Sequence, residues 1–403
     1  MATHRNRRGC PSTRGRNRRL VALGAVVVVV ALGLGVLMYL AGPRLKGLFH
    51  LPGRREAGPL YEQTEDLPGF VARVDHALYG ALFRLGVEAE AISFERVERR
   101  RLDGKEWEEA HVRVRLPRRV GLKAAQAEML RSLAPFGKRL STTWQTGANG
   151  GRLYVRWDGL LTHCVELHRG LRVPKALVAP PPAPLPRVAV VMDDLGYDPG
   201  QFERVKKLRA EITCSVLPLS PHGRRIAQLA AEAGLECLLH LPMEAEGLPL
   251  KKLGDGALLM DMDAGQLLHA LREDLNDLPR VSGVNNHMGS LLTANAPRMK
   301  VVLRELKRRN LFFLDSRTTS RSLGCSLAEK MGVKTAGRSI FLDDVQDKAA
   351  VLAQLAKLVS VARSQGKAVA ICHPYPATLG ALEEGLPSLK GKVRLVPVSR
   401  LVH

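Results

Sequence analysis

Short apolar segments alternate with amphipathic segments over the C-terminal half of the chain, and this alternation constrains the fold more than any other feature. The apolar segments have the length of strands buried on both faces, and the segments between them have helical spacing. Such an alternation predicts an α/β domain with a parallel sheet, either open or closed into a distorted (β/α)7 barrel. The predicted strands are 188–192, 212–217, 235–239, 281–285, 311–314, 339–342 and 368–372, and the predicted helices are 201–209, 223–233, 264–277, 297–309, 322–331 and 348–365.

An uncharged apolar run near the N-terminus, from Leu20 to Ala41, predicts a membrane anchor. At a rise of 1.5 Å per residue the run gives a helix of about 33 Å, enough to cross a hydrocarbon core of about 30 Å. The arginine-rich segment 1–19 precedes it, so the positive-inside rule places that tail in the cytoplasm and the rest of the chain outside. A cleaved signal peptide is the alternative, but the run is longer than a usual signal-peptide core, and Ala41-Gly42-Pro43 is a poor cleavage signal.

The remainder of the chain divides by composition. A spacer rich in proline, glycine and charge covers 42–69, and a proline-rich linker covers 176–186. Between them, 70–175 shows mixed helical and strand patterns without a chemical motif, and it is expected to be a small accessory α/β domain. The main domain is expected over 187–403.

The net charge of +22 raises the question of nucleic-acid binding. Part of the basic excess lies in the N-terminal tail, and the rest is scattered without a patch in which aromatic residues interleave, so nucleic acid is not an expected partner. Six cysteines include no C-x-x-C pair and are expected to be buried thiols, although Cys214 and Cys237 could form a bridge if their strands are neighbours.

Polar and ionisable residues follow most of the predicted strands. Because the carboxyl ends of parallel strands meet at one edge, these side chains are expected to converge there. Asp198 before Pro199 already provides the helix N-cap after the first strand, so the acids that precede it need another explanation. The converging residues are Asp193 and Asp194, His240, Asn286 and His287, Asp315, and His373.

Aspartate and histidine suit a divalent ion such as zinc, which lowers the pKa of a bound water to about 7 and makes it a nucleophile. Because neighbouring side chains on a strand point apart, adjacent acids can divide the labour. Asp194 is expected to bind the metal, and Asp193 to act as the general base.

Six blocks, in order, resemble the divergent polysaccharide deacetylase family. This family is related to metal-dependent carbohydrate esterases with a distorted β/α barrel, and the resemblance implies removal of N-acetyl or O-acetyl groups from a polysaccharide. It also implies that Asp193 is the base, that Asp194 binds the metal and that His373 is the general acid. The blocks are VAVVMDDLGYD (188–198), LLHLPME (238–244), GVNNHMGS (283–290), LFFLDSRTTS (311–320), IFLDD (340–344) and AICHPYPATL (370–379).

The sequence departs from the wider superfamily at its paired-histidine metal motif. The pattern H-x-x-x-H has His240 in the first place and Glu244 in the second, so either Glu244 or His287 completes the site. His287 is favoured, because a neutral imidazole leaves the metal more Lewis-acidic. Asp315 and Arg317 are expected to position the base or to hold substrate, unless they form an ion pair that only orders a loop. Asn286 is a further candidate for substrate binding.

Together these features predict a single-pass protein of the inner or plasma membrane, with its catalytic domain periplasmic or extracellular. The expected partners are an envelope polysaccharide and, through the N-terminal helix, the membrane; the expected cofactor is a divalent metal such as zinc. The alternative is a glycan-binding or scaffold protein that keeps the barrel and has lost turnover, which the substituted metal motif favours.

Overall fold

The computed structural model describes residues 67–88, 91–103, 105–147, 150–169, 184–247, 253–278 and 280–403. The predicted tail, the predicted anchor and most of the spacer and linker lie outside these ranges. Within them, no helix combines the length and apolar character needed to cross a bilayer. The described residues all belong to one compact unit.

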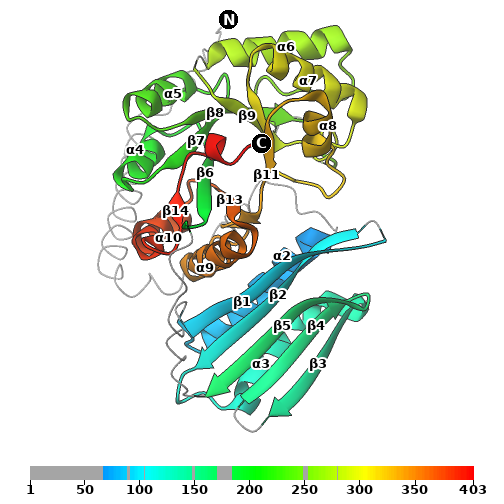
Figure 1. Cartoon of the computed structure of the whole chain (residues 1–403), viewed down its shortest axis with the longest axis vertical. Helices are drawn as coiled ribbons and strands as arrows, with labels where there is room; N and C mark the ends of the chain where they lie inside the picture. Colours follow the sequence, from blue (N-terminus) through cyan, green and yellow to red (C-terminus); the bar gives the residue numbers. More distant parts are fainter. Residues whose placement is uncertain are drawn as a thin grey trace, which may run out of the picture. The chain divides into compact units, whose positions relative to one another are not determined.

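The C-terminal half contains a parallel sheet with the order β11-β10-β9-β8-β7-β6-β13-β12, and β14 pairs with β6. The sheet curls with helices against its outer side (Figure 1). Since β11 and β12 are the two ends of this order, the described strands form an open, curled sheet instead of a closed barrel. The strands are β6 (Arg187–Leu195), β7 (Ile212–Val216), β8 (Cys237–Met243), β9 (Gly283–Met288), β10 (Phe312–Asp315), β11 (Thr335–Gly337), β12 (Ile340–Phe341), β13 (Lys367–Cys372) and β14 (Arg394–Leu395).

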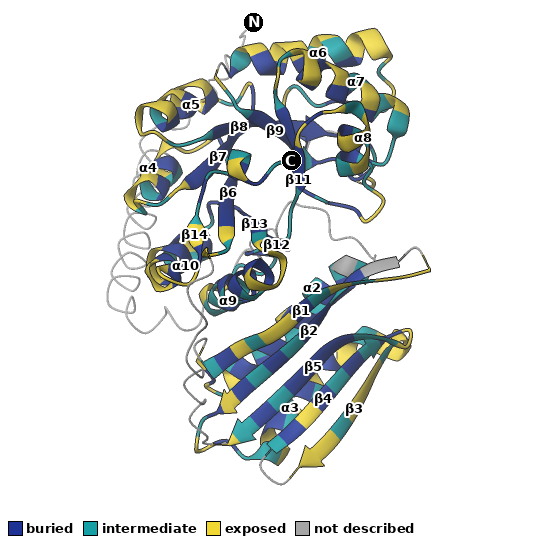
Figure 2. Cartoon of the chain, in the orientation of Figure 1, coloured by how far each residue is buried: buried dark blue, intermediate teal, exposed yellow. Residues whose placement is uncertain are grey.

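The helices of this half begin where the chain offers a cap. Asp198 accepts a hydrogen bond from the backbone of Gly200 at the start of α4, and Asp263 with Gln266 forms a capping box at the start of α6. Their exposed faces point away from the buried strands (Figure 2). The helices are α4 (Pro199–Lys207), α5 (Gly223–Glu232), α6 (Ala264–Asp277), α7 (Ala296–Arg308), α8 (Gly324–Met331), α9 (Lys348–Gln365) and α10 (Pro376–Gly385).

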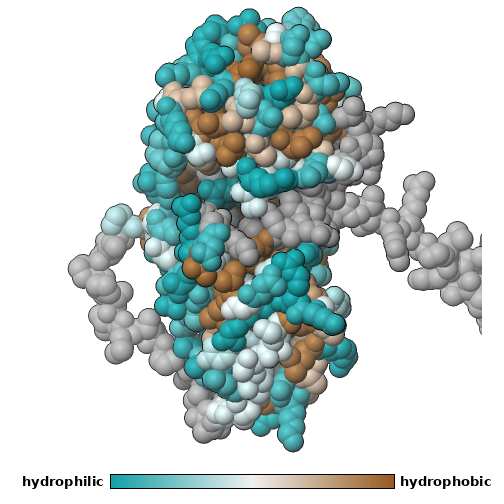
Figure 3. Space-filling model, turned by 90° about the vertical axis from the view of Figure 1, so that its right-hand side faces the viewer, coloured by the Kyte–Doolittle hydropathy of each residue, from teal (hydrophilic) through white to brown (hydrophobic). Residues whose placement is uncertain are grey.

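The seven predicted strands and six predicted helices of this half are all present, whereas β11, α10 and β14 were not predicted. Cys214 and Cys237 lie opposite each other on β7 and β8, but the described cysteines are all free thiols. On the face drawn in Figure 3, hydrophobic side chains form separate areas between hydrophilic ones, which is typical of protein surfaces.

The preceding part of the chain forms a second, five-stranded sheet with the order β1-β2-β5-β4-β3. Its pairs are antiparallel except β2 with β5, which are parallel. Val74, Leu78 and Met129 on its helices contribute to the core. The elements are α2 (Leu67–Arg84), β1 (Ile92–Leu102), β2 (Lys105–Leu116), α3 (Leu122–Leu133), β3 (Leu140–Gly147), β4 (Gly150–Trp157) and β5 (Leu160–Arg169).

Helix α9 connects the two sheets. Lys357, buried on α9, lies 2.8 Å from the Asp75 carboxylate of α2 and 3.0 Å from that of Glu108 on β2. The hydroxyl of Ser360 donates to the backbone carbonyl of Phe94 on β1, which is an edge strand. The helix therefore covers a sheet edge that would otherwise expose unpaired backbone groups.

Candidate metal centre and active site

A β-bulge in β6 sets the geometry of the two adjacent acids. The pairing of β6 with β7 shifts register between Met192 and Leu195, and Asp194 has a left-handed backbone with φ of 57°. A bulge re-aims side chains that a regular strand would point to opposite faces. Consequently both acids approach His240: its Nε2 lies 3.1 Å from Asp194 Oδ1 and 3.6 Å from Asp193 Oδ2. The expectation that the neighbours point apart is therefore wrong.

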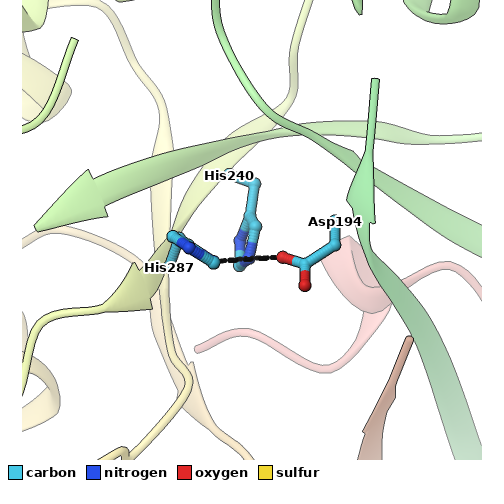
Figure 4. A group of neighbouring side chains, drawn as sticks. All are labelled: Asp194, His240 and His287. Carbon is cyan, nitrogen blue, oxygen red and sulfur yellow. Dashed lines mark hydrogen bonds and ion pairs between the residues drawn. The ribbon is translucent and has the colours of Figure 1, made fainter. Parts of the chain in front are cut away.

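Three potential ligand atoms from three different strands meet at one point (Figure 4). Asp194 Oδ1 lies 3.0 Å from His287 Nδ1 and 3.1 Å from His240 Nε2, and the two histidine nitrogens are 3.1 Å apart. The positions follow from the sheet, because β6, β8 and β9 deliver these residues to the same edge. This is the one group of at least three potential ligands found among the described residues.

The donor set fits a divalent cation. Asp194 Oδ1 is buried and accepts no hydrogen bond of ordinary geometry from a described residue, although two ring nitrogens lie near it. Neighbouring ligands of an ion bound at about 2.0–2.2 Å lie about 3 Å apart, as these atoms do. One carboxylate and two imidazoles suit zinc and similar metals. The site therefore matches what a cation requires.

Burial and charge interactions shift the pKa values of the two acids in opposite directions. Burial alone would raise the pKa of Asp194, but His287 and His240 hold it well below its usual range. For Asp193, burial raises the pKa, and the positive charges of His240 and His373 oppose that shift only in part. Asp194 therefore stays ionised to lower pH, and Asp193 has the greater proton affinity of the two.

His373 forms a buried pair with Asp343. Its Nδ1 lies 3.0 Å from Asp343 Oδ1, and Asp343 Oδ2 accepts hydrogen bonds from the His373 backbone and from the hydroxyl of Thr378. Burial would lower the pKa of His373, but Asp343, Asp194 and Asp193 raise it to about 10. The imidazole is therefore protonated at neutral pH, as a proton donor must be.

Glu244, the rival third ligand, lies outside the metal cluster. Its Oε2 accepts a hydrogen bond from the backbone of Met260 at 2.6 Å. Among the described residues, His287 from the next strand is the third potential ligand that lies with Asp194 and His240.

Asp315 is buried, but its carboxylate contacts neither Asp193 nor the cluster. It accepts hydrogen bonds from the hydroxyl of Ser322 and from the backbones of Arg317 and Cys325. These contacts order the segment between β10 and α8, so a catalytic role for Asp315 is not what its contacts support.

The two predicted substrate-binding residues are likewise engaged within the protein. Asn286 is buried; its amide donates to the carbonyl of Met288 and accepts from the backbone of Ser316. Arg317 packs its guanidinium against Gly337 on β11. Neither contact reaches the metal cluster, and both residues instead shape the loops that follow β9 and β10.

Two residues of the site were not assigned roles from the sequence. They are Asp343 and Asn285, which lies next to the predicted Asn286. A signal existed for Asp343, because it directly follows a predicted strand. For Asn285 the strand alternation was the available signal, since it places Asn285 and His287 on the same face of β9.

Comparisons with known proteins show the family of the chain. The model of the divergent polysaccharide deacetylase family matches residues 190–402, which is more than half of the chain. This chain belongs to the divergent polysaccharide deacetylase family.

Relatives of this chain include YibQ, an uncharacterized protein of Escherichia coli K12. It is 37% identical over 219 residues, which cover 54% of this chain and 67% of the relative. An uncharacterized protein of Haemophilus influenzae is 35% identical over 215 residues, covering 53% and 76%. A crystal structure of an uncharacterized Agrobacterium tumefaciens protein matches with a TM-score of 0.53 and 26% identity, covering 55% of this chain and 90% of that one.

Proposed function

We propose that the protein is a metal-dependent hydrolase that removes acetyl groups from a polysaccharide of the cell envelope. The observation that carries the proposal is the convergence of Asp194, His240 and His287 on one point, with Asp193 beside them. Family membership supports a polysaccharide as the substrate class. A structural ion pair would explain one of these contacts but not three ligand atoms with mutual separations of about 3 Å.

Each residue then has a chemical role. A divalent ion held by Asp194, His240 and His287 would activate water and polarise the acetyl carbonyl. Asp193, whose pKa is raised by burial, accepts the proton of the attacking water. His373 is protonated and donates to the departing amine or hydroxyl group of the sugar, and Asp343 orients its ring. Asp193 and His373 thus serve as the base and the acid of the proposed reaction.

We also propose that the apolar run 20–41 anchors the protein in the inner or plasma membrane with its tail in the cytoplasm. The arginine-rich segment before the run supports this orientation. The catalytic domain would then face the periplasm or the cell exterior, where envelope polysaccharides are found. Zinc is the proposed metal, because two imidazoles and one carboxylate are common zinc ligands.

The alternative is a glycan-binding or scaffold protein without turnover, which the replacement of the second motif histidine by Glu244 favours. Against this alternative, His287 lies with Asp194 and His240, whereas Glu244 accepts a hydrogen bond from the backbone of Met260. This arrangement supports a three-ligand site in spite of the replacement.

Acetate release by the full-length protein tests the proposal. Metal-free protein and protein reconstituted with zinc are incubated with acetylated peptidoglycan and with O-acetylated glycans. We expect zinc-dependent acetate release that falls by about 10²-fold or more in His373→Ala. Zinc-loaded protein that binds these glycans and releases no acetate would instead identify the scaffold.

A further inference from the structure

Asn285 lies at the centre of a buried network that joins Asp193 to His240. It is fully buried on β9, and its Nδ2 donates to Asp193 Oδ1 at 2.9 Å and to Oδ2 at 3.1 Å. Its Oδ1 lies 3.1 Å from His240 Nδ1 and accepts a hydrogen bond of 2.6 Å from the hydroxyl of Ser215. A single amide therefore contacts both the proposed base and a proposed metal ligand.

The network determines the orientation of the amide and the tautomer of the histidine. An ionised carboxylate only accepts hydrogen bonds, so the amide nitrogen must face Asp193 and the amide oxygen must face His240. Because a carbonyl oxygen only accepts, His240 must carry its hydrogen on Nδ1. In the neutral ring, Nε2 then presents a lone pair on the side where Asp194 and His287 lie.

The partners of Asn285 distinguish it from an ordinary structural asparagine. The adjacent Asn286 binds the backbones of Met288 and Ser316, and in this way it fastens two loops. The contacts of Asn285 are to side chains: Asp193, His240, Ser215 and Ser316. Its amide therefore orients side chains of the site, whereas Asn286 holds backbone segments together.

We infer that Asn285 is a positioning residue that fixes His240 in its metal-binding tautomer and holds the carboxylate of Asp193 in one orientation. The inference rests on the proposed function, because His240 and Asp193 have their roles in that function. Asn285 contacts no reacting atom and acts only through these two side chains. Residues that orient metal ligands in this way typically change metal affinity by 10- to 100-fold.

The test compares Asn285→Ala, Asn285→Asp and a matched control, Ser215→Ala, in the full-length protein. Asn285→Ala removes both contacts, whereas Asn285→Asp keeps an oxygen facing His240 and loses the donor to Asp193. Ser215→Ala removes a hydrogen bond to the same amide without touching Asp193 or His240. The readouts are zinc affinity from chelator competition, kcat and KM for acetate release, and urea unfolding.

We expect Asn285→Ala to bind zinc about 10- to 100-fold more weakly and to lose kcat at saturating zinc with little change in KM. Asn285→Asp should keep most of the zinc affinity and lose kcat, and Ser215→Ala should change both by less than about threefold. A folded Asn285→Ala protein with wild-type zinc affinity and kcat overturns the inference.

A spectroscopic measurement separates this inference from the proposed function. In metal-free wild-type protein with ¹⁵N-labelled histidine, at a pH where the ring is neutral, His240 should carry its hydrogen on Nδ1. A hydrogen on Nε2 contradicts the inference. If the wild type releases no acetate, the proposed function fails, yet the tautomer still decides the role of Asn285. If Asn285→Ala does not fold, the tautomer in the wild type still tests the inference.

Discussion

At the residue scale, the site depends on charges that compensate one another within the protein interior. His373 is buried and still protonated because Asp343 accepts hydrogen bonds from both its ring and its backbone. A buried carboxylate that accepts no such hydrogen bonds should instead take up a proton itself. In the described part of the chain, Asp343 is a buried carboxylate with hydrogen-bond donors and Asp274 is one without them, and each leads to a prediction of its own.

Replacing Asp343 by Asn should move the alkaline limb of the pH–rate profile to lower pH. His373 donates a proton, so activity is lost as pH rises through its pKa, and removal of the Asp343 charge lowers that pKa. The kcat should also fall by about 10²-fold. The control Thr378→Val removes a neutral hydrogen bond to the same carboxylate and should leave the limb in place. An unchanged limb in Asp343→Asn would exclude His373 as the proton donor.

Replacing Asp274 by Asn should remove a pH-dependent loss of stability. Asp274 on α6 is buried, neither carboxylate oxygen has a hydrogen-bond partner among the described residues, and burial, with Asp277 and Glu273, raises its pKa to about 8.

Between pH of about 4 and 8 the unfolded chain binds fewer protons at this residue than the folded chain does. The free energy of unfolding therefore falls as pH rises, by at most about 1.4 kcal/mol per pH unit. Urea unfolding at pH 5 and pH 8 checks this: Asp274→Asn should show a flatter dependence, and an identical dependence in both proteins would refute it.

The sequence allowed most of the site residues to be predicted, because Asp193, Asp194, His240, His287 and His373 each lie in or after an apolar strand. The contacts of Asp315, Arg317 and Asn286 could not be predicted in the same way. Their partners lie at strand or helix ends and in the segments between them, and no periodicity reports where such a group lies. Asn285 illustrates the same limit, since its partner Asp193 is 92 residues away.

At the element scale, regular periodicity predicted well and irregular geometry did not. The boundaries of α6 and α9 agree with the predicted ranges, since both helices start at an aspartate cap and α9 ends at a left-handed glycine. The bulge in β6 was missed, because nothing in the order VAVVMDDL marks a left-handed aspartate. Two-residue strands such as β12 and β14 are also too short for periodicity to define their bounds.

Helix α9 provides a prediction about buried charge. Lys357→Ala leaves the buried Asp75 without its lysine partner and should lower the free energy of unfolding by about 3–5 kcal/mol. The control on the same helix is Lys348→Ala, which breaks an exposed pair with Glu384 and should cost less than about 1 kcal/mol. Urea unfolding of the two variants measures both values. Equal effects would show that the buried contact does not hold α9 to α2.

At the scale of the whole molecule, helix α9 joins an open, curled parallel sheet to a second sheet. The fold class of the C-terminal half followed from alternating strands and helices, but an open sheet could not be distinguished from a closed barrel. That difference depends on whether the first and last strands pair, which strand composition does not encode. The edge-to-helix contact of α9 with β1 likewise arises only in three dimensions.

The central claim is that Asp194, His240 and His287 hold a metal ion. The most direct test is the metal content of the full-length protein after reconstitution with zinc and removal of unbound metal, in the wild type, His287→Ala and Glu244→Ala. We expect about one zinc per wild-type chain, loss of zinc in His287→Ala and retention in Glu244→Ala. A wild type without zinc, or loss of zinc in Glu244→Ala but not in His287→Ala, would contradict the claim.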